Sequence, residues 1–135
     1  MAANDVRSKP RTFFIDIDGT LIKHHGSLRQ QLSSKLVAID GALEFIDECE
    51  RRGDRVILVT GRKQMHRYET ERQLSALGIS YDELVMDVGS GMRVVVNDRK
   101  PGSAIDTAYA MSVDRNTDGS LSSINDVIDG EIDAR

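Results

Sequence analysis

The sequence is poor in the residues that usually reinforce very small domains. It contains one cysteine, Cys49, no tryptophan and only two prolines. A single cysteine excludes an internal disulfide and a thiolate metal cluster. Because Cys49 lies within a helical pattern, we expect it to be a small buried hydrophobic side chain.

Long apolar runs are also absent. The longest have about four residues, as at residues 56–59, whereas a membrane-spanning helix needs about twenty. Residues 1–10 are polar and lack the apolar segment of a secretory signal. We therefore expect a cytoplasmic protein that has no membrane partner.

The composition is that of an ordinary globular domain. A chain of 135 residues can build one domain with a real core and is too short for two. Hydrophobic residues make up 39% and charged residues 30%, which excludes a wholly disordered chain. The net charge is −4 and the basic residues are interspersed with acidic ones, so we expect no nucleic-acid partner.

Short β-rich apolar runs alternate with longer helical patterns along the chain. Strands are predicted at 12–17, 55–60 and 93–97, with a short strand at 84–86 and an edge strand at 108–113. Helices are predicted between Asp40 as N-cap and Gly53 as stop, and from about His66 to Leu77. Buried strands separated by helices indicate an α/β fold with a doubly wound, mostly parallel sheet and helices on both faces.

The predicted domain covers residues 12–121. Residues 1–11 are interpreted as an N-terminal extension, and residues 122–135 as a C-terminal tail with a short helix through Ile124 and Ile128. Ligands of a doubly wound sheet bind beyond the carboxyl ends of the strands. The residues that follow the predicted strands are therefore the candidates for a functional site.

Two aspartates mark the end of the first predicted strand. Asp16 and Asp18 are two residues apart, so both carboxylates project from one face of an extended chain. Two like charges this close repel each other unless a cation lies between them or one carboxyl group keeps its proton. A hard divalent ion suits the pair, and Mg²⁺ is the usual one where a phosphate completes the shell.

Groups that can bind an anion follow the first two strands. Gly19 lets the chain turn sharply and lets a substrate approach the backbone, and Thr20 after it is a further candidate phosphate-binding residue. Thr60 offers a hydroxyl, and the amides of Gly61 and Arg62 can join it in binding anionic oxygens. The sequence thus predicts a phosphate-binding edge.

Carboxylates beside such an edge indicate phosphoryl transfer. In the reaction that we predict, Asp16 attacks phosphorus and forms a covalent aspartyl phosphate, which water later hydrolyses. Asp18 would protonate the leaving oxygen and then activate the water. The expected activity is therefore that of a phosphomonoester hydrolase.

Two stretches resemble the haloacid dehalogenase superfamily. Residues 13–21 (FFIDIDGTL) resemble motif I, whose first Asp is the nucleophile and whose second Asp is the general acid and base. Residues 56–62 (VILVTGR) resemble motif II, whose Thr or Ser holds the transferring phosphoryl group. An Asp at position 18 resembles the phosphatase branch, in which acid catalysis expels an alkoxide.

A third stretch, residues 94–98 (VVVND), resembles motif IV, whose acid completes the Mg²⁺ shell. The resemblance implies that Asp16, Asp18 and Asp98 hold the ion, Asp18 through its backbone carbonyl. The sequence departs from the family pattern because Asn97 precedes Asp98, where a second acid is usual nearby. This leaves the metal shell one charge lighter than in many relatives.

Motif III of the family, a Lys or Arg that neutralises the nucleophile and the phosphate, has no plain match. Lys100 lies two residues past Asp98, on the expected catalytic edge. Arg93 precedes the third predicted strand, which puts its backbone about 13 Å or more from that edge at about 3.3 Å per residue. We therefore favour Lys100 over Arg93, with Lys63 third.

No cap domain fits between the motifs. Members of the family insert a substrate-recognising cap between motifs I and II or between II and III, and predicted helices and strands fill both intervals here. The resemblance implies a minimal, capless member, like small sugar-acid phosphatases that use a neighbouring subunit as a lid, or like phosphatases that act on macromolecules. We expect a phosphorylated sugar, sugar acid or other small metabolite as substrate, and a homo-oligomer could supply the lid.

Three alternatives remain open. Asp114, Asn116 and Asp118 match positions of an EF-hand calcium loop, but Asn125 stands where a bidentate Glu is usual, and a polar turn explains the pattern equally well. A receiver domain would need a phosphoacceptor Asp where Thr60 ends the second strand. A catalytically weak or inactive relative used as a binding or scaffold module would fit the light motif IV.

Overall fold

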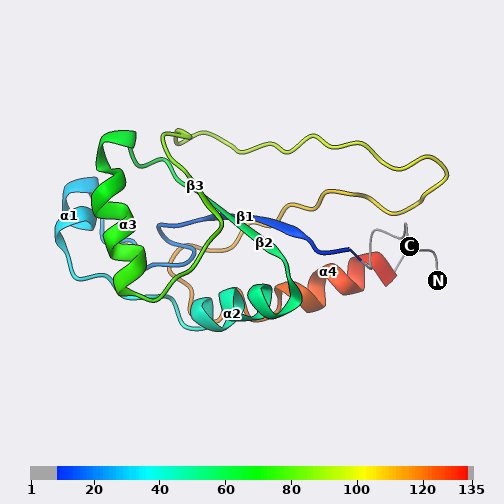
Figure 1. Cartoon of the computed structure of the whole chain (residues 1–135), viewed down its shortest axis with the longest axis horizontal. Coiled ribbons are helices and arrows are strands. Elements are labelled where there is room, and N and C mark those ends of the chain that lie inside the picture. The colour runs from blue at the N-terminus through cyan, green and yellow to red at the C-terminus, as the bar shows by residue number, and fades with distance from the viewer. Residues whose placement is uncertain (1–8, 134–135) are drawn as a thin grey trace.

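The structure is a computed structural model that describes residues 9–133. Within them, a parallel sheet runs in the order β1 (Thr12–Asp16), β2 (Arg55–Val59) and β3 (Glu83–Val85) (Figure 1). The α-helices of this part are α1 (Leu28–Ser33), α2 (Ala42–Arg52), α3 (Arg67–Ala76) and α4 (Ile124–Asp133), with a 3₁₀ helix at Gln64–His66. Most of the predicted N-terminal extension lies outside the described residues.

The hydrophobic core lies against one face of the sheet. The strand register pairs Ile15 with Leu58 and Leu58 with Leu84, so these side chains point to the same face. Both crossovers step in the same direction along the sheet, and right-handed connections then put α2 and α3 on the same face. The core cluster combines these strands with helical residues: Phe45, Ile46, Cys49, Leu74 and Ile124.

The buried cysteine is confirmed. Cys49 is 1% exposed on α2, and burial raises the pKa of its thiol to about 11. At neutral pH the thiol is therefore protonated and behaves as a small apolar side chain.

The opposite face of the sheet is partly open. The register puts Phe14 beside Ile57, and Asp16 beside Val59 and Val85, on this face. Phe14 is 61% exposed and Val85 is also exposed. β1 is an edge strand, because it stands at one end of the strand order β1-β2-β3 in the described residues 9–133. The expected α/β class with a parallel sheet and helices is confirmed, and no cap is present in the described part of the chain.

The two helices predicted from periodicity are present. α2 ends before Gly53, as expected, but its N-cap is Gly41 in a left-handed conformation rather than Asp40. The backbone N–H of Asp40, one residue earlier, donates to Oδ1 of Asp118 at 3.0 Å. α1 was not predicted from the sequence, although Ser27 and Gln30 form a capping box that marks its start.

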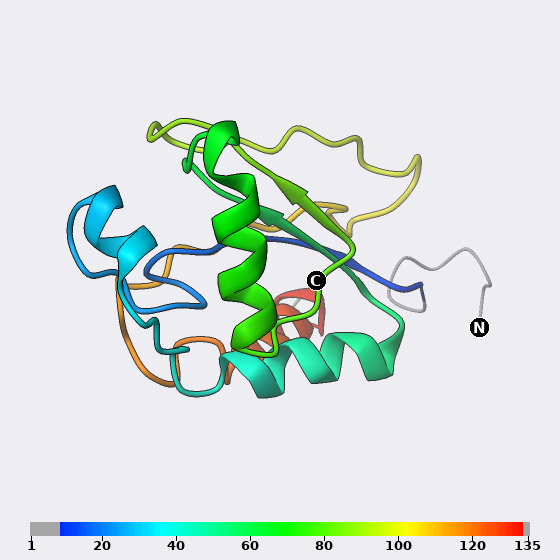
Figure 2. The same cartoon turned by 60° about the vertical axis from the view of Figure 1, so that its left-hand side comes forward.

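The strands predicted at 93–97 and 108–113 are wrong. These residues form the two limbs of an extended segment, residues 87–113, which we call the arm and which leaves the sheet on the side away from α2 (Figures 1 and 2). A parallel strand needs a crossover of a dozen or more residues, and residues 86–92 are too few. The N–H of Val88 also donates to the carbonyl of Thr60 at 3.0 Å, which holds the base of the arm at the end of β2.

The tail contributes to the same core. α4 begins at Ile124, which is buried, and Ile128 packs against the cluster. The short helix predicted there is present and extends to Asp133. No helix within residues 9–133 is long and apolar enough to cross a membrane.

The core predicts a stability effect. Leu58 is fully buried in the central strand, so Leu58→Ala removes buried methyl groups and leaves a cavity. We expect a loss of about 3 kcal/mol in the free energy of unfolding, measured by urea denaturation. Val37→Ala, at an exposed position, should change it by less than about 0.5 kcal/mol. Equal losses in the two variants would contradict the described core.

Candidate active site

The loop after β1 folds back tightly on the end of the strand. The carbonyl of Ile17 accepts hydrogen bonds from the N–H groups of Leu21 and Ile22 at 2.9 and 3.1 Å, and the N–H of Gly19 donates to the carbonyl of Ile22 at 2.7 Å. Gly19 has a φ of +89°, which favours glycine. The sharp turn predicted at Gly19 is therefore present.

Asp16 is the open carboxyl group of this edge. Its side chain is 36% exposed, and Nη1 of Arg93 lies 3.3 Å from its Oδ1. The hydroxyl of Thr20 donates to its Oδ2 at 3.4 Å. Burial raises the pKa of Asp16, and the nearby charge of Asp18 adds to that shift, whereas the guanidinium of Arg93 opposes it.

Asp18 is held by a bidentate ion pair. Nε of Arg62 donates to its Oδ2 and Nη2 to its Oδ1, both at 2.8 Å. The amide of Gln31 also donates to Oδ1 at 2.8 Å. Arg62 is 3% exposed, so this pair is largely shielded from water and links the loop after β1 to the end of β2.

A hydrogen-bond network extends from this pair to two helices. The remaining guanidinium nitrogen of Arg62 donates to Thr70 and Gln73 of α3 at 3.1 and 2.6 Å. The amide of Gln73 donates to the backbone carbonyl of Gln31 in α1 at 2.9 Å. From the sequence, only the backbone amide of Arg62 was predicted to belong to the site; its side chain, Gln31 and Gln73 were not.

Thr60 and Gly61 shape the turn after β2. Oγ1 of Thr60, which is buried, accepts a hydrogen bond from the N–H of Arg62 at 3.1 Å. Its hydroxyl proton can still be donated. A Cβ at Gly61 would lie 3.0 Å from the carbonyl oxygen of Gly89, so glycine allows the base of the arm to pass closely. A contact between Thr60 and a phosphoryl group stays a prediction.

Residues of the segment that resembles an EF-hand loop, residues 114–125, form hydrogen bonds with the loop after β1. The N–H of Asn116 donates to the carbonyl of Gly19 at 2.9 Å, and its side-chain amide forms two hydrogen bonds with the backbone of His24, at 2.6 and 3.0 Å. Asp118 accepts from the N–H of Asp40 at 3.0 Å and pairs with Lys23 at 2.9 Å. The polar-turn alternative therefore accounts for these side chains.

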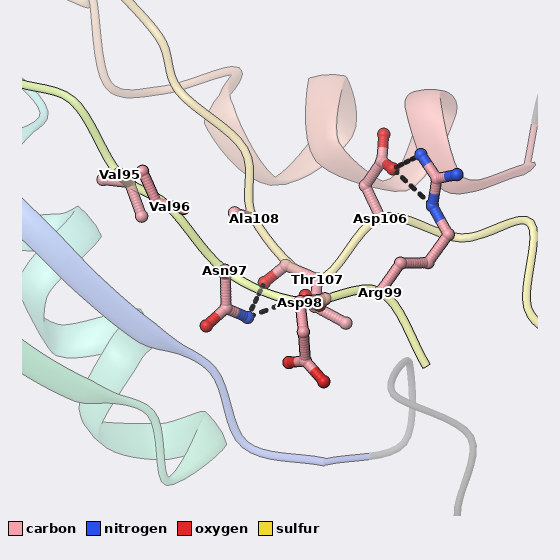
Figure 3. Close-up of a pocket in the computed structure, with 8 residues that line it drawn as sticks. All are labelled: Val95, Val96, Asn97, Asp98, Arg99, Asp106, Thr107 and Ala108. Atoms are coloured by element: carbon pink, nitrogen blue, oxygen red, sulfur yellow. Dashed lines mark hydrogen bonds and ion pairs between the residues drawn. The ribbon is translucent and has the colours of Figure 1, made fainter. Parts of the chain in front are cut away.

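The arm residues that were predicted to belong to the site lie at different places along the arm, and only some of them are near Asp16. Arg93, in the first limb of the arm, contacts Asp16. Arg93 was expected far from the catalytic edge because the distance was counted along a strand at 93–97, and that strand does not form. Asp98 lies in the outer part of the arm, near residues 106–108 (Figure 3). Lys100 follows it there, and Lys63 pairs with Asp87 at 3.1 Å. The contact therefore favours Arg93 over Lys100 beside the candidate nucleophile.

The arrangement does not complete a magnesium site. In the described part of the chain, no group of three or more His, Cys, Asp or Glu side chains could hold a metal ion. Asp16 offers an open carboxylate. Asp18 is expected to contribute only its backbone carbonyl, and its side-chain oxygens accept hydrogen bonds from Arg62 and Gln31. The third ligand implied by the resemblance, Asp98, lies on the arm.

The raised pKa of Asp16 predicts a pH-dependent stability difference. Since burial favours the neutral carboxyl group, ionisation of Asp16 destabilises the folded state as the pH rises through its raised pKa. Asp16→Asn removes this cost. We expect the variant to gain stability over the wild type near pH 7, and to lose that gain below about pH 4, where the unfolded carboxyl group is also protonated. Urea denaturation in EDTA measures the difference in the free energy of unfolding between the variant and the wild type. A difference that does not change with pH would contradict the raised pKa of Asp16.

The Asp18–Arg62 pair predicts a second stability effect. Arg62→Met leaves Asp18 without its ion partner, which should cost about 3 kcal/mol in the free energy of unfolding. Arg62→Lys should recover little, because an ammonium group cannot form the two parallel hydrogen bonds. Arg29→Met on the exposed surface of α1 is the control and should change stability by less than about 0.5 kcal/mol. Full rescue by lysine would show that charge alone matters.

Comparisons with known proteins identify the family of the chain. The chain matches the family model described as haloacid dehalogenase-like hydrolase over residues 13–107. A chain in the solved structure described as "Structure of Pnkp1/Rnl/Hen1 complex" is 28% identical with a TM-score of 0.52, and the match covers 63% of this chain and 30% of that one. No curated protein matches the chain. The family match spans well over half of the sequence, so the protein belongs to the haloacid dehalogenase-like hydrolases.

Proposed function

We propose that the protein is a phosphomonoester hydrolase that works through an aspartyl phosphate at Asp16, with Mg²⁺ as its cofactor. The observation that carries the proposal is the position of Asp16 at the carboxyl end of β1, open to solvent and beside Arg93. Membership of a hydrolase family supports it. The proposed substrates are phosphorylated sugars, sugar acids or other small metabolites, the class that the resemblance to small capless sugar-acid phosphatases implies.

The first step forms a bond between an Asp16 carboxylate oxygen and phosphorus. The bond between phosphorus and the ester oxygen breaks, and Asp18, which must carry a proton at the start of this step, gives that proton to the leaving oxygen. In the second step, water attacks the phosphorus of the aspartyl phosphate and gives a proton to Asp18. The bond between phosphorus and Asp16 breaks, inorganic phosphate leaves, and both carboxyl groups return to their starting states.

Positive charge is needed because an ionised Asp16 and a phosphate repel each other. Arg93 supplies one such charge, and its side chain is exposed enough to contact a bound phosphoryl group as well. Burial makes Asp16 harder to ionise, whereas Arg93 favours the carboxylate that must attack. Arg93 therefore takes the neutralising role for which the sequence favoured Lys100.

The surroundings of Asp18 set a condition on its role. Its two oxygens are occupied by Arg62 and Gln31, so proton transfer requires Asp18 to loosen from Arg62 or to use a remaining lone pair. The same observation, together with the lack of a group of three metal-ligating side chains in the described residues, supports a second candidate function, a catalytically weak or inactive binding module. Turnover with and without EDTA separates the two candidates.

Asp16→Asn tests the nucleophile. The variant keeps the shape of the side chain but cannot attack phosphorus, so hydrolysis of an aryl phosphate should fall by at least about 10³-fold. The circular dichroism spectrum should match that of the wild type. Wild-type activity in this variant would reject the aspartyl phosphate, and an inactive wild-type protein would favour the binding module.

Asp18→Asn tests the acid in the same experiment. A nitrophenolate leaves without a proton, whereas an alkoxide does not, so the loss should be larger for an alkyl phosphate than for nitrophenyl phosphate. If Asp18 serves mainly to hold Arg62, the two substrates should lose activity equally. The ratio of the two losses, measured as kcat, therefore decides between proton transfer and positioning.

A further inference from the structure

Gln31 is a polar side chain that is buried although it lies on the short helix α1. It is 1% exposed. Its amide nitrogen donates to Oδ1 of Asp18 and to the carbonyl oxygen of Lys23, both at 2.8 Å, and its amide oxygen accepts a hydrogen bond from the N–H of His25 at 2.8 Å. Leaving a buried polar group without a partner costs free energy, so such bonds are kept in the folded state. Gln31 therefore ties α1 to the loop after β1 and to the candidate acid.

The hydrogen bonds of Gln31 fix the orientation of its amide. Both hydrogens of the amide nitrogen face acceptors, the carboxylate of Asp18 and the carbonyl of Lys23, and the amide oxygen faces a donor, the N–H of His25. In the opposite orientation the amide oxygen would lie against two acceptors, and the amide nitrogen would lie against a donor. Toward Asp18, Gln31 therefore acts only as a hydrogen-bond donor.

A closed ring of hydrogen bonds holds Gln31 beside Asp18. Oε1 of Gln73 accepts from Arg62 at 2.6 Å. The amide nitrogen of Gln73 donates to the backbone carbonyls of Gln31 and Leu32 at 2.9 and 3.3 Å. Arg62 donates to Asp18, and the side chain of Gln31 completes the ring. Since α1 has six residues and is too short to be a stable helix alone, its position depends on contacts such as these.

The donors around Asp18 are shared unequally between its two oxygens. Each carboxylate oxygen offers two lone pairs to hydrogen-bond donors. At Oδ1 both are used, one by Nη2 of Arg62 and one by the amide of Gln31. At Oδ2 the part of the chain that the structure describes uses one, through Nε of Arg62. A proton on Oδ1 would therefore displace a donor, whereas a proton on Oδ2 displaces none.

We propose that Gln31 is a positioning residue for proton transfer by Asp18. By filling the second lone pair of Oδ1, it leaves Oδ2 as the atom that carries the proton and gives it to the leaving oxygen. This role rests on the proposed function, in which Asp18 protonates the leaving group. The side chain of Asp18 is 16% exposed, so part of it stays accessible to a substrate.

The role of Gln31 lets Asp18 transfer a proton while it stays paired with Arg62. When the bond between phosphorus and the ester oxygen breaks, the proton on Oδ2 passes to the ester oxygen, and Asp18 becomes a carboxylate. In the second step, the attacking water gives a proton back to Oδ2. Both hydrogen bonds from Arg62 persist throughout, because neither occupies the lone pair that the proton uses.

The hydrogen bond itself can be tested on the wild-type protein without any activity. Nuclear magnetic resonance should detect a scalar coupling between Nε2 of Gln31 and the carboxyl carbon of Asp18, transmitted through the hydrogen bond of 2.8 Å. Absence of this coupling would overturn the proposal, because Gln31 would then not fill the lone pair of Oδ1.

Gln31→Met tests the effect on catalysis. Methionine has a similar length but offers no donor, so the proton of Asp18 can lie on either oxygen. We expect kcat for an alkyl phosphate to fall about tenfold more than kcat for nitrophenyl phosphate, whose leaving group needs no proton. KM should change equally for the two substrates. Gln31→Asn keeps an amide but withdraws it by one methylene group, and it should give the same split between substrates if the methionine variant does not fold.

Ser27→Ala is the matched control for a loosened helix. The hydroxyl of Ser27 caps α1 by accepting from the N–H of Gln30 at 3.3 Å, so this variant weakens α1 and keeps the donor at Oδ1. It should change the two kcat values equally. Equal losses for both substrates in the Gln31 variants, or the same split in Ser27→Ala, would overturn the positioning role and leave the proposed function standing. A wild type that hydrolyses neither substrate would overturn the proposed function, and the role of Gln31 with it.

Discussion

The buried ion pair between Arg62 and Asp18 is the constraint on which the rest of the site depends. A guanidinium that is 3% exposed needs a charged partner, because an unpaired buried charge costs several kcal/mol. Asp18 provides that partner through two hydrogen bonds and thereby fixes the loop after β1 against the end of β2. Asp16 lies just before that loop, so an ion pair in which it takes no part helps to set its position.

Local sequence patterns predicted the parts of the fold that local physics determines. Apolar runs marked β1 and β2, helical periodicity marked α2 and α3, and Gly53 marked the end of α2. The strand predicted at 93–97 is wrong. Its β-rich residues favour an extended backbone, but they do not determine whether the segment pairs with a sheet. Whether such a segment joins a parallel sheet depends on the length of the connection before it, and residues 86–92 are too short.

In the candidate site, the functional residues could be predicted from the sequence, but their hydrogen-bond partners could not. The carboxylates and the hydroxyl at the strand ends were predicted from their positions alone. Their partners were not, because Gln31 and Gln73 reach Arg62 and Asp18 from helices that the spacing of motifs does not describe. Arg93 was ranked second only because its distance from Asp16 was counted along a strand that does not form.

Arg93 sets the electrostatic environment of Asp16. Its Nη1 lies 3.3 Å from Oδ1 of Asp16, and this guanidinium opposes the effect of burial on the pKa of the carboxyl group. Asp98, which the resemblance pairs with Asp16, lies in the outer part of the arm instead. The two groups that act on Asp16 therefore come from different parts of the fold: the sheet and the loop after β1 bury the carboxyl group, and the arm supplies a positive charge beside it. A change in the position of the arm would for this reason alter the ionisation of the candidate nucleophile without any change in β1 itself.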